Sequence, residues 1–313
     1  MTSIASPSAV QNAVLPRLLV FGEALTDLVR TADDHWRSVA GGACWNVARA
    51  ASALGVPTGW AGAVSNDLFG DEIARLSRQA GLDMRFLQVV PKAPLIAVVH
   101  ELDPPRYFFL GNDTADLAFE EALLPAGWED ACQVAHFGCI SLVRQPLGAR
   151  LLAIAERLHA RGVRISFDPN CRNLMGADYP PLFERLASLA DVIKLSDEDL
   201  AHIYPSLGVD AGLAKVRSVA PDAEILYTRG AAGLALHAGA QVVEQPAFRV
   251  EVVDTVGAGD ACIGAFLSSR LLRPGLALKE HARFAAACAA LACTRQGAFA
   301  PSSADVRRQL SGA

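Results

Sequence analysis

The stretch Asp254-Thr-Val-Gly-Ala-Gly-Asp260 determines the fold that we predict for the chain around it. Before it, apolar and charged residues alternate from Phe248 to Val252, which predicts a strand with one buried face. After it, apolar residues recur at helical spacing from Ile263 to Leu271. The segment is therefore expected to run as a strand, a turn of small residues and a helix.

The small residues of this turn favour a bound anion. Gly257, Ala258 and Gly259 let backbone N–H groups converge at the start of a helix, where unpaired donors and the helix dipole attract negative charge. Asp260 falls in the first helical turn beside that position. A carboxylate gains nothing electrostatically next to an anion, but it can take a proton from a hydroxyl that attacks the anion. The alternative is that Asp260 is an ordinary first-turn residue stabilised by the helix dipole.

Two better-known phosphate loops are excluded by the sequence. A Walker loop needs a lysine directly after a glycine, and none of the four lysines follows one. A dinucleotide fingerprint needs a third glycine three positions after Gly259, where Cys262 stands. The turn therefore predicts a different kind of phosphoryl-binding site.

Composition describes a globular chain without the features of a nucleic-acid or membrane protein. Its 313 residues are 52% hydrophobic, and the net charge of −5 comes with no basic cluster, so we expect no nucleic-acid partner. No apolar run approaches the ~20 residues that span a bilayer, so we expect no membrane partner. Residues 1–14 lack the pattern of a signal peptide and are expected to form a disordered tail. Seven cysteines without a Cys-x-x-Cys pair predict reduced thiols in a cytoplasmic protein, and the seven histidines show no zinc-ligand spacing.

Strands and helices alternate through most of the chain, which is typical of an α/β domain. One interruption stands out, because three β-rich runs follow one another without a helix between them. Antiparallel strands of this kind suggest a small sheet apart from the main body, which could form a lid together with the stretch after Gly22. The runs are 84–90, 95–102 and 106–110, and the lid is expected from about 23–40 and 84–112 within a single domain over 15–313.

Polar residues follow several predicted strands at their carboxyl ends, which is where open α/β sheets bind ligands. Asp168-Pro-Asn-Cys-Arg172 follows the strand predicted at 163–167. Ser196-Asp-Glu-Asp199 follows the next strand, although a capping serine with acidic first-turn residues explains that segment well by itself. Gly41-Gly42 opens a helix that carries Asn46, either as a flexible turn or to let a ligand approach the backbone closely.

Two segments together resemble the signatures of a known family. Gly41-Gly-Ala-Cys-Trp-Asn46-Val-Ala, followed by Leu54-Gly55, and Asp254-Thr-Val-Gly-Ala-Gly-Asp260-Ala are similar in order and separation to the two motifs of the ribokinase-like (PfkB) carbohydrate kinases. The likeness extends from Leu18 to about Gly297. It implies a three-layer α/β/α sandwich with a mostly parallel central sheet and a small β-sheet lid. It also implies ATP and Mg²⁺ as cosubstrate, phosphoryl transfer to a sugar hydroxyl, and a homodimer that pairs through the lid.

The resemblance further implies roles for individual residues. Asp260 looks like the catalytic base, with the backbone of Gly257, Ala258 and Gly259 as the anion hole. The positions similar to the family's sugar-binding residues are Asp27, Gly41, Gly42, Asn46, Phe109 and Arg172. Those similar to its nucleotide-binding residues are Lys194, Ser196, Asp199, Thr228, Arg229, Gly230 and Gly233. The residues that match a site for a monovalent cation such as K⁺ are Asp254 and Val256, the latter through its carbonyl.

One position departs from the family pattern. Members usually carry a glutamate three residues after an Asn or Ser, whereas this chain carries Asp199 three residues after Ser196. Aspartate is one methylene shorter, which shortens its reach toward a hydrated Mg²⁺. The neighbouring Glu198 is the alternative carboxylate for that task.

Within the family the chain is most similar to fructokinases, through Asp168-Pro-Asn-x-Arg172, Lys194-Leu-Ser and Thr114-Ala-Asp116. Kinases of 2-keto-3-deoxygluconate share much of this pattern, but they tend to carry an arginine after the lid's aromatic pair. Here Leu110 follows Phe108-Phe109, which favours a neutral sugar, while nearby Arg106 leaves an acid sugar open. The prediction is an ATP-dependent fructokinase. The alternatives are 2-keto-3-deoxygluconate, ribose or a nucleoside as acceptor, or a non-catalytic sugar or nucleotide sensor.

Overall fold

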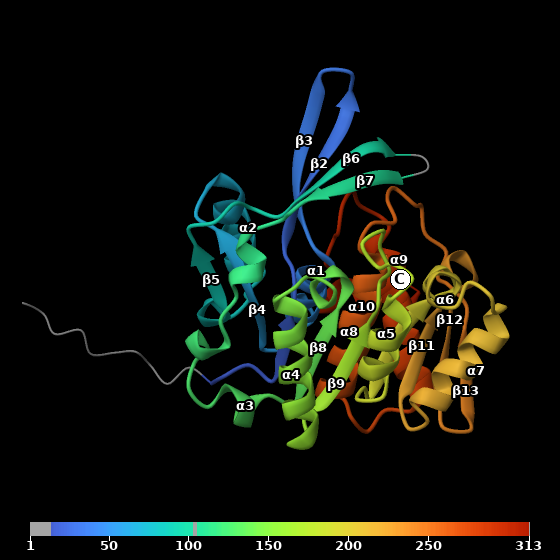
Figure 1. Ribbon diagram of the computed structural model, residues 1–313. Coiled ribbons are helices and arrows are strands. Elements are labelled where there is room, and N and C mark those ends of the chain that lie inside the picture. The colour runs from blue at the N-terminus through green and yellow to red at the C-terminus, as the bar shows by residue number, and fades with distance from the viewer. Residues whose placement is uncertain (1–13, 103–104, 313) are drawn as a thin grey trace, which may run out of the picture.

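The computed structural model describes residues 14–102 and 105–312 and shows a large sheet between layers of helices, with a small sheet standing apart (Figure 1). The large sheet is mostly parallel, as predicted, and antiparallel pairing joins two strands at one edge. Its strands, in spatial order, are β13 (Gln241–Gln245), β12 (Leu234–Ala238), β11 (Glu224–Thr228), β10 (Val192–Ser196), β9 (Arg164–Asp168), β8 (Val134–Gly138), β1 (Leu18–Phe21), β4 (Thr58–Ser65) and β5 (Leu87–Val90).

The interior strand β1 shows why both faces of this sheet are covered. Leu19 and Phe21 belong to one apolar cluster, and Leu18 and Val20 belong to another on the opposite face. The first cluster contains residues of α3 (Trp128–Ala131), α4 (Leu147–Ala160), α5 (Tyr179–Ala187), α6 (Asp197–Ile203) and α7 (Val209–Val219). The second contains residues of α1 (Ala43–Ala53), α2 (Leu68–Gln79), α8 (Ala258–Leu272) and α9 (Leu278–Ala292). Helix α10 (Ser303–Ser311) packs on α9 and adds to this second layer. Because helices cover both faces of the sheet, the arrangement is the predicted α/β/α sandwich (Figure 1).

The parallel strands end at one edge of the sheet, and the register shows which ends are level. Gly138 pairs with Asp168 between β8 and β9. Ser196 pairs with Thr228 between β10 and β11. Residues that follow these strands are therefore gathered at a single edge, although they are far apart in the sequence. That edge is where an open α/β sheet binds its ligands.

The predicted small sheet is present, with one difference in its membership. Its strands, in spatial order, are β3 (His35–Gly41), β2 (Leu25–Ala32), β6 (Ile96–Leu102) and β7 (Pro105–Leu110). The placement of 84–90 in this sheet is wrong. That run forms a short 3₁₀ turn, Met84–Phe86, and then β5, which pairs in parallel with β4. The reason is that α2 connects β4 to β5 as a β-α-β unit, and the fully buried Phe86 anchors the turn in the core of the main domain.

The strand predicted at Phe248–Val252 is also wrong. Those residues pair with no strand, and Val252 and Val253 are 60% and 61% exposed. The chain instead crosses the end of α9, where the N–H of Val253 donates to the carbonyl of Cys293 at 2.8 Å. This segment lies on the surface and has no neighbouring strand to pair with. The alternation of apolar and charged residues therefore does not produce a strand here.

The tail predicted at 1–14 lies, except for Val14, outside the described residues. Within the part of the chain that the structure describes, no helix has the length and apolar character needed to cross a bilayer.

Candidate active site

The turn before α8 needs glycine at its first position. Gly257 is the N-cap of α8 and has a φ of 77°, in the left-handed region. A Cβ on Gly257 would lie 2.6 Å from the Cβ of Ala298. Ala258 donates its N–H to the carbonyl of Thr255, so it is engaged within the turn. Of the predicted anion hole, Gly257 and Gly259 have N–H groups without an acceptor among the described residues. The N–H of Asp260 also has none, and these groups are free to bind an anion.

Asp260 is positioned differently from other first-turn aspartates of this protein. Asp199 in α6 and Asp305 in α10 also stand three residues after an N-cap, and each accepts a hydrogen bond from its N-cap backbone in a capping box. Asp260 does not, because its Oδ2 accepts from Nδ2 of Asn46 at 2.9 Å. Its side chain is thus held by α1 rather than used to cap its own helix. This geometry argues against the ordinary helix-capping interpretation of Asp260.

The electrostatic surroundings of Asp260 suit a base. The side chain is buried, and burial raises the pKa of Asp260 above its usual value. The hydrogen bond from Asn46 and the charges of Lys194 and Arg172 oppose that shift. A raised pKa brings the carboxylate closer to the operating pH, which makes it a stronger proton acceptor.

A buried ion pair lies beside the turn. Lys194 Nζ on β10 lies 3.1 Å from an oxygen of Asp168 at the end of β9, and both side chains are almost inaccessible. A Cβ on Gly259 would lie only 3.1 Å from the same Nζ, so the ammonium borders the anion site. Burial raises the pKa of Asp168 to about 7 although Lys194 opposes it. Burial alone would lower the pKa of Lys194. The nearby carboxylates of Asp168 and Asp199 outweigh this effect and raise the pKa.

The carboxylate of Asp199 is already satisfied by hydrogen bonds. One oxygen accepts from the backbone N–H of Cys171 at 2.7 Å, and the other accepts from Ser196 N and Oγ at 2.8 Å. Burial alone would raise the pKa of Asp199, but Lys194 and these hydrogen bonds lower it. Asp199 therefore fastens the start of α6 to the loop after β9. Glu198 beside it is exposed.

The predicted sugar-binding residues come together from the small sheet and the start of α1. In the register of the small sheet, Asp27 pairs with Ala97, and Ala97 pairs with Phe109, so these side chains share one face. Burial raises the pKa of Asp27 to about 6, and the charge of Arg172 opposes this shift. Asn46 Oδ1 is buried without a hydrogen-bond partner among the described residues, so it can accept from a ligand hydroxyl.

The glycine pair that opens α1 is required by close contacts. A Cβ on Gly41 would lie 2.6 Å from Asp27 Oδ2. Gly42 has a φ of 112°, and a Cβ there would lie 2.7 Å from the carbonyl oxygen of Glu23. Both glycines are therefore required by contacts within the fold, and close approach of a ligand to this backbone stays a prediction.

The predicted nucleotide-binding residues lie at the ends of β10 and β11. Ser196 and Thr228 are level in the sheet, and Gly230 and Gly233 have positive φ values of 51° and 92° in the turn that follows. Arg229, however, forms an ion pair with Glu244 on β13, and its Nε is buried without a partner among the described residues. The side chain of Arg229 is therefore held, at least in part, by its ion pair with the outermost strand β13.

Comparison with known proteins agrees with this geometry. A family model, described as pfkB family carbohydrate kinase, matches residues 15–305.

The chain belongs to the pfkB family of carbohydrate kinases.

Relatives of this pfkB kinase include a fructokinase of Klebsiella pneumoniae, 32% identical over 307 residues that cover 94% of this chain and 99% of the relative. Among solved structures, a fructokinase with bound ATP from Xylella fastidiosa has a TM-score of 0.85 at 28% identity, covering 95% of this chain and 99% of that chain. A Vibrio cholerae O395 fructokinase in fructose, ADP and calcium ion bound form has a TM-score of 0.83 at 26% identity, covering 95% and 100%. The predicted fold and the resemblance to fructokinases are confirmed.

One residue that organises the site of this pfkB kinase was missed by sequence analysis. Glu23 is fully buried, and one of its oxygens accepts the N–H of Ala43 at 3.1 Å while the other accepts from Ser141 Oγ. It thereby joins the end of β1 to the start of α1 and to the turn after β8. Burial raises the pKa of Glu23. Its position directly after a buried strand and Gly22, at the ligand-binding edge, is the signal that could have found it.

Asp254, predicted for a monovalent cation, holds two loops together. Its Oδ1 accepts from the N–H of Val256 at 3.1 Å, and its Oδ2 accepts from the N–H of Gly297 at 2.8 Å. The turn that carries Gly257 is therefore fixed against the loop that follows α9.

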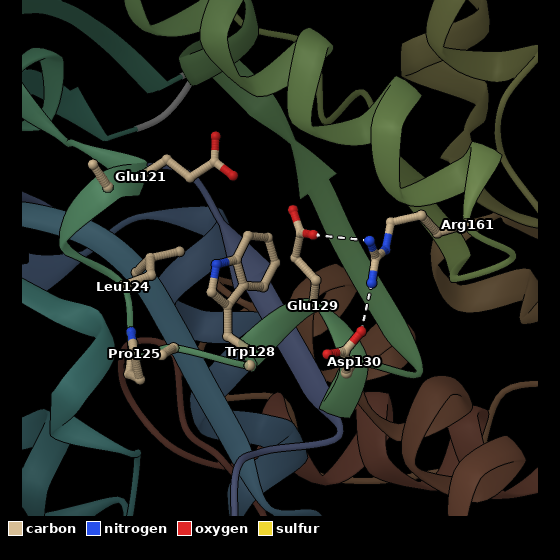
Figure 2. A pocket seen from close by; sticks show the side chains of 10 residues that line it. Glu121, Leu124, Pro125, Trp128, Glu129, Asp130 and Arg161 are labelled. Atoms are coloured by element: carbon tan, nitrogen blue, oxygen red, sulfur yellow. Dashed lines mark hydrogen bonds and ion pairs between the residues drawn. The ribbon is translucent and has the colours of Figure 1, made fainter.

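A pocket at the opposite edge of the sheet contains none of these residues (Figure 2). It is lined by Leu124, Trp128 and several charged residues, and Arg161 there pairs with Glu129 and Asp130. Because α3 precedes β8, this pocket lies at the amino ends of the strands. Ligands of open α/β sheets bind at the other edge, so this pocket is not the catalytic site.

Proposed function

We propose that this pfkB kinase transfers the γ-phosphoryl group of ATP to a hydroxyl of D-fructose, with Asp260 as general base. The observation that carries the proposal is the placement of Asp260. It is a buried first-turn carboxylate that Asn46 holds away from capping, beside the unpaired backbone N–H groups of the turn. The fructokinases among its relatives support the choice of acceptor.

The chain's own residues divide the reaction between them. Asp260 Oδ1 accepts no hydrogen bond from the described residues, so this oxygen takes the proton of the attacking hydroxyl. The N–H groups of Gly257, Gly259 and Asp260 meet the charge on the migrating phosphoryl group, and each such donor is worth ~3 kcal/mol in the transition state. Lys194 adds a fixed positive charge at the same turn. The small sheet closes over the sugar and excludes water, which protects the phosphoryl group from hydrolysis.

Mg²⁺ and K⁺ are part of the proposal. Bound with ATP, Mg²⁺ neutralises charge on the phosphate oxygens. Among the described residues no cluster of three or more His, Cys, Asp or Glu could hold a metal, which fits an ion held chiefly by the nucleotide with Glu198 or Asp199 nearby. Since Asp199 is already hydrogen-bonded through both oxygens, Glu198 is the freer of the two carboxylates. Asp254 and the Val256 carbonyl remain the proposed site of K⁺.

A neutral acceptor fits the charges on the small sheet better than an acid sugar. Leu110 holds the position after the aromatic pair where 2-keto-3-deoxygluconate kinases tend to carry an arginine, and in the strand register it lies on the face opposite to Phe109. Arg106, the other candidate for that carboxylate, pairs with Glu101 at 3.3 Å. Its charge is therefore largely compensated by its neighbour.

An acceptor panel tests the proposal. With ATP, Mg²⁺ and K⁺, we expect D-fructose to give the highest kcat/KM among fructose, 2-keto-3-deoxygluconate, ribose and nucleosides, measured by ADP release. A preference for the acid sugar would contradict the argument from Leu110 and Arg106. Calorimetric binding of fructose without turnover of any acceptor would instead support a sugar sensor.

The affinity for sugar is expected to fall as the pH drops below about 6. The ionised Asp27 is the better acceptor for sugar hydroxyls, and burial raises its pKa to about 6, so acid protonates it within an accessible range. Calorimetric titration of fructose without nucleotide measures this directly. The Asp27→Asn variant should bind more weakly near neutral pH and show little change over the same range. An identical pH dependence in that variant would assign the titration to another group.

We also propose a homodimer formed through the outer face of the small sheet. Residues on this face alternate with those that face the sugar, and Trp36, Phe108 and Leu110 there are 47%, 50% and 52% exposed. Large exposed apolar side chains gathered on one sheet face are typical of a protein interface. A second copy of this chain is the proposed occupant.

Sedimentation velocity tests this pairing. We expect a dimer for the unmodified protein and a shift toward monomer for Phe108→Asp, because a charge would be buried in the interface. Val242→Asp provides a matched control, since Val242 is 46% exposed on β13 of the large sheet. A monomeric unmodified protein would contradict the proposal.

The proposed cytoplasmic location is supported by the state of the cysteines. All seven are free thiols in the structure, and five of them are buried. Such thiols persist in a reducing compartment.

A further inference from the structure

A second pocket lies behind the turn that carries the proposed base. Its volume is about 600 Å³, and it is enclosed by the β2–β3 hairpin, the helices α1 and α2 and the loop after α9. None of the residues predicted to bind sugar lines it, although Val39, the strand partner of Asp27, does. Thr26 and Ser38 line it, and in the strand register they stand on the face opposite to Asp27 and Phe109.

The charged side chains around this pocket are predominantly positive. Arg49 and Arg295 line it, and neither forms an ion pair with a carboxylate among the described residues. The one acidic residue in the lining is Glu72, which accepts two hydrogen bonds from Arg75, at 2.6 and 2.8 Å. Its charge is thereby neutralised. The pocket thus presents two uncompensated guanidinium groups to a ligand.

Arg49 is held in an environment that lacks a counter-ion. Its guanidinium stacks 4.4 Å from the ring centre of Trp45, and Nη1 donates a long hydrogen bond of 3.4 Å to the carbonyl of Ala298. Its Nε is buried without a partner among the described residues. Burial lowers the pKa of Arg49. A half-buried guanidinium with donors to spare is costly unless an acceptor is supplied.

The rest of the lining suits a small organic anion. Arg295 stacks 4.2 Å from the ring centre of Phe299, which fixes its position at the rim. The hydroxyls of Thr26 and Ser38 add donors, and Phe69 and Leu76 give an apolar wall. Arginine forks match the oxygens of phosphate and carboxylate groups in geometry as well as charge.

We propose that this pocket binds a small phosphorylated metabolite, with Arg49 and Arg295 holding the phosphoryl group. The ligand would be either free phosphate or a phosphate ester, which share this chemistry. An ester has additional groups for Thr26, Ser38 and the apolar wall, so a sugar phosphate is expected to bind more tightly than inorganic phosphate.

The pocket is connected to the catalytic turn through its loop. Ala298, which accepts from Arg49, lies against Gly257, so closely that a Cβ on Gly257 would clash with it. Gly297 of the same loop donates to Asp254. A ligand that draws Arg49 toward itself would break the hydrogen bond from Arg49 to Ala298. It would thereby change the packing of Ala298 against the turn at Gly257. Resting on the proposed function, we expect occupancy of the pocket to change kcat.

Calorimetric titration with inorganic phosphate, and separately with D-fructose 6-phosphate, tests the binding in the absence of nucleotide. We expect Arg49→Gln and Arg295→Gln each to weaken binding at least tenfold, since each removes charge-assisted hydrogen bonds. Arg78→Gln is the matched control, because Arg78 is an exposed arginine of α2 outside the pocket. It should leave binding unchanged. Because Arg295 is exposed, its variant is expected to remain folded, as thermal unfolding will verify.

The outcomes separate the pocket from the catalytic turn. Phosphate that binds the unmodified protein and both arginine variants equally would lie at the α8 turn or elsewhere, and would overturn the inference. No binding of either probe would also overturn it. Specific loss in the two variants would establish the site even if no acceptor is phosphorylated, so this result does not depend on the kinase proposal. A change of kcat with phosphate that disappears in Arg295→Gln would then establish the coupling.

Discussion

Replacing Asp260 with asparagine should lower kcat for phosphoryl transfer by roughly 10²–10⁴-fold while leaving the affinity for sugar nearly unchanged. The amide preserves the shape of the side chain, but it cannot take a proton from the attacking hydroxyl. Asn46 can still contact the new side chain, because its amide offers both a donor and an acceptor. The loss should therefore appear in kcat, measured by ADP release under saturating substrates, with fructose affinity measured separately by calorimetry.

The pH profile of the unmodified enzyme provides a second check on the same residue. Burial raises the pKa of Asp260 above its usual value, so activity should fall on the acid side earlier than an ordinary aspartate would cause. The Asp260→Asn variant should lack that acid limb in its residual activity. Retention of the limb would mean that another group, such as Asp27 or Asp168, produces it.

Asp305→Asn is the matched control for this substitution. Asp305 also stands three residues after an N-cap, but there it completes a capping box on the surface helix α10. Its substitution should cost less than about 1 kcal/mol of stability, because Ser302 still caps the helix and an amide oxygen can still accept from the Ser302 backbone, and it should leave kcat unchanged. If both variants lost activity equally, the effect would be one of helix stability, and Asp260 would not be the base. Full activity in Asp260→Asn would remove the assignment directly.

Comparing Asp260 with Asp305 also shows what the sequence could and could not predict. The Gly-Ala-Gly run after Thr255 and Val256 predicted an anion-binding helix start, because small residues and unpaired amides are local properties. The contact that distinguishes Asp260, however, comes from Asn46, which is 214 residues away. Local patterns contain no information about such a partner. The family resemblance, rather than spacing alone, placed Asn46 in the site.

The errors have the same origin. Residues 84–90 were assigned to the small sheet because β-rich runs look alike, and only the β4–α2–β5 crossover shows that β5 extends the main sheet. Phe248–Val252 alternates like a strand, but a strand also needs an edge to pair with. Glu23 was missed because its function depends on Ala43 and Ser141, which the fold brings together. In each case the structure depends on contacts, or on their absence, between parts of the chain that are far apart in the sequence. Local periodicity does not reveal such contacts.

Replacing Lys194 with methionine is expected to destabilise the protein by about 3 kcal/mol at alkaline pH and to abolish most activity. The substitution leaves Asp168 buried without its partner, which lies 3.1 Å away in the unmodified protein. It also removes the positive charge beside Gly259, where the migrating phosphoryl group is proposed to bind. Arg185→Met is the control, because the Arg185–Glu156 pair is exposed and should contribute less than about 1 kcal/mol.

The pH dependence of this loss identifies its cause. Burial already raises the pKa of Asp168 to about 7, and removal of Lys194 raises it further. A carboxyl whose pKa is raised on folding binds more protons in the native state, so stability falls as pH rises from the unfolded pKa toward the folded one. In the unmodified protein that fall ends near pH 7. In Lys194→Met it continues above that pH, so the difference in unfolding free energy should be small under mildly acidic conditions. It should grow by up to about 1.4 kcal/mol for each further pH unit.

The double variant Lys194→Met/Asp168→Asn separates the charge from the packing. With no carboxylate at position 168 to ionise, the pH-dependent part of the loss should disappear above pH 7, where denaturant unfolding should give a nearly constant stability relative to the unmodified protein. Activity should stay low, because the charge at the phosphoryl site is still missing. A double variant that kept the pH dependence of Lys194→Met would mean that another buried acid, such as Asp260 or Asp199, is the group that Lys194 stabilises.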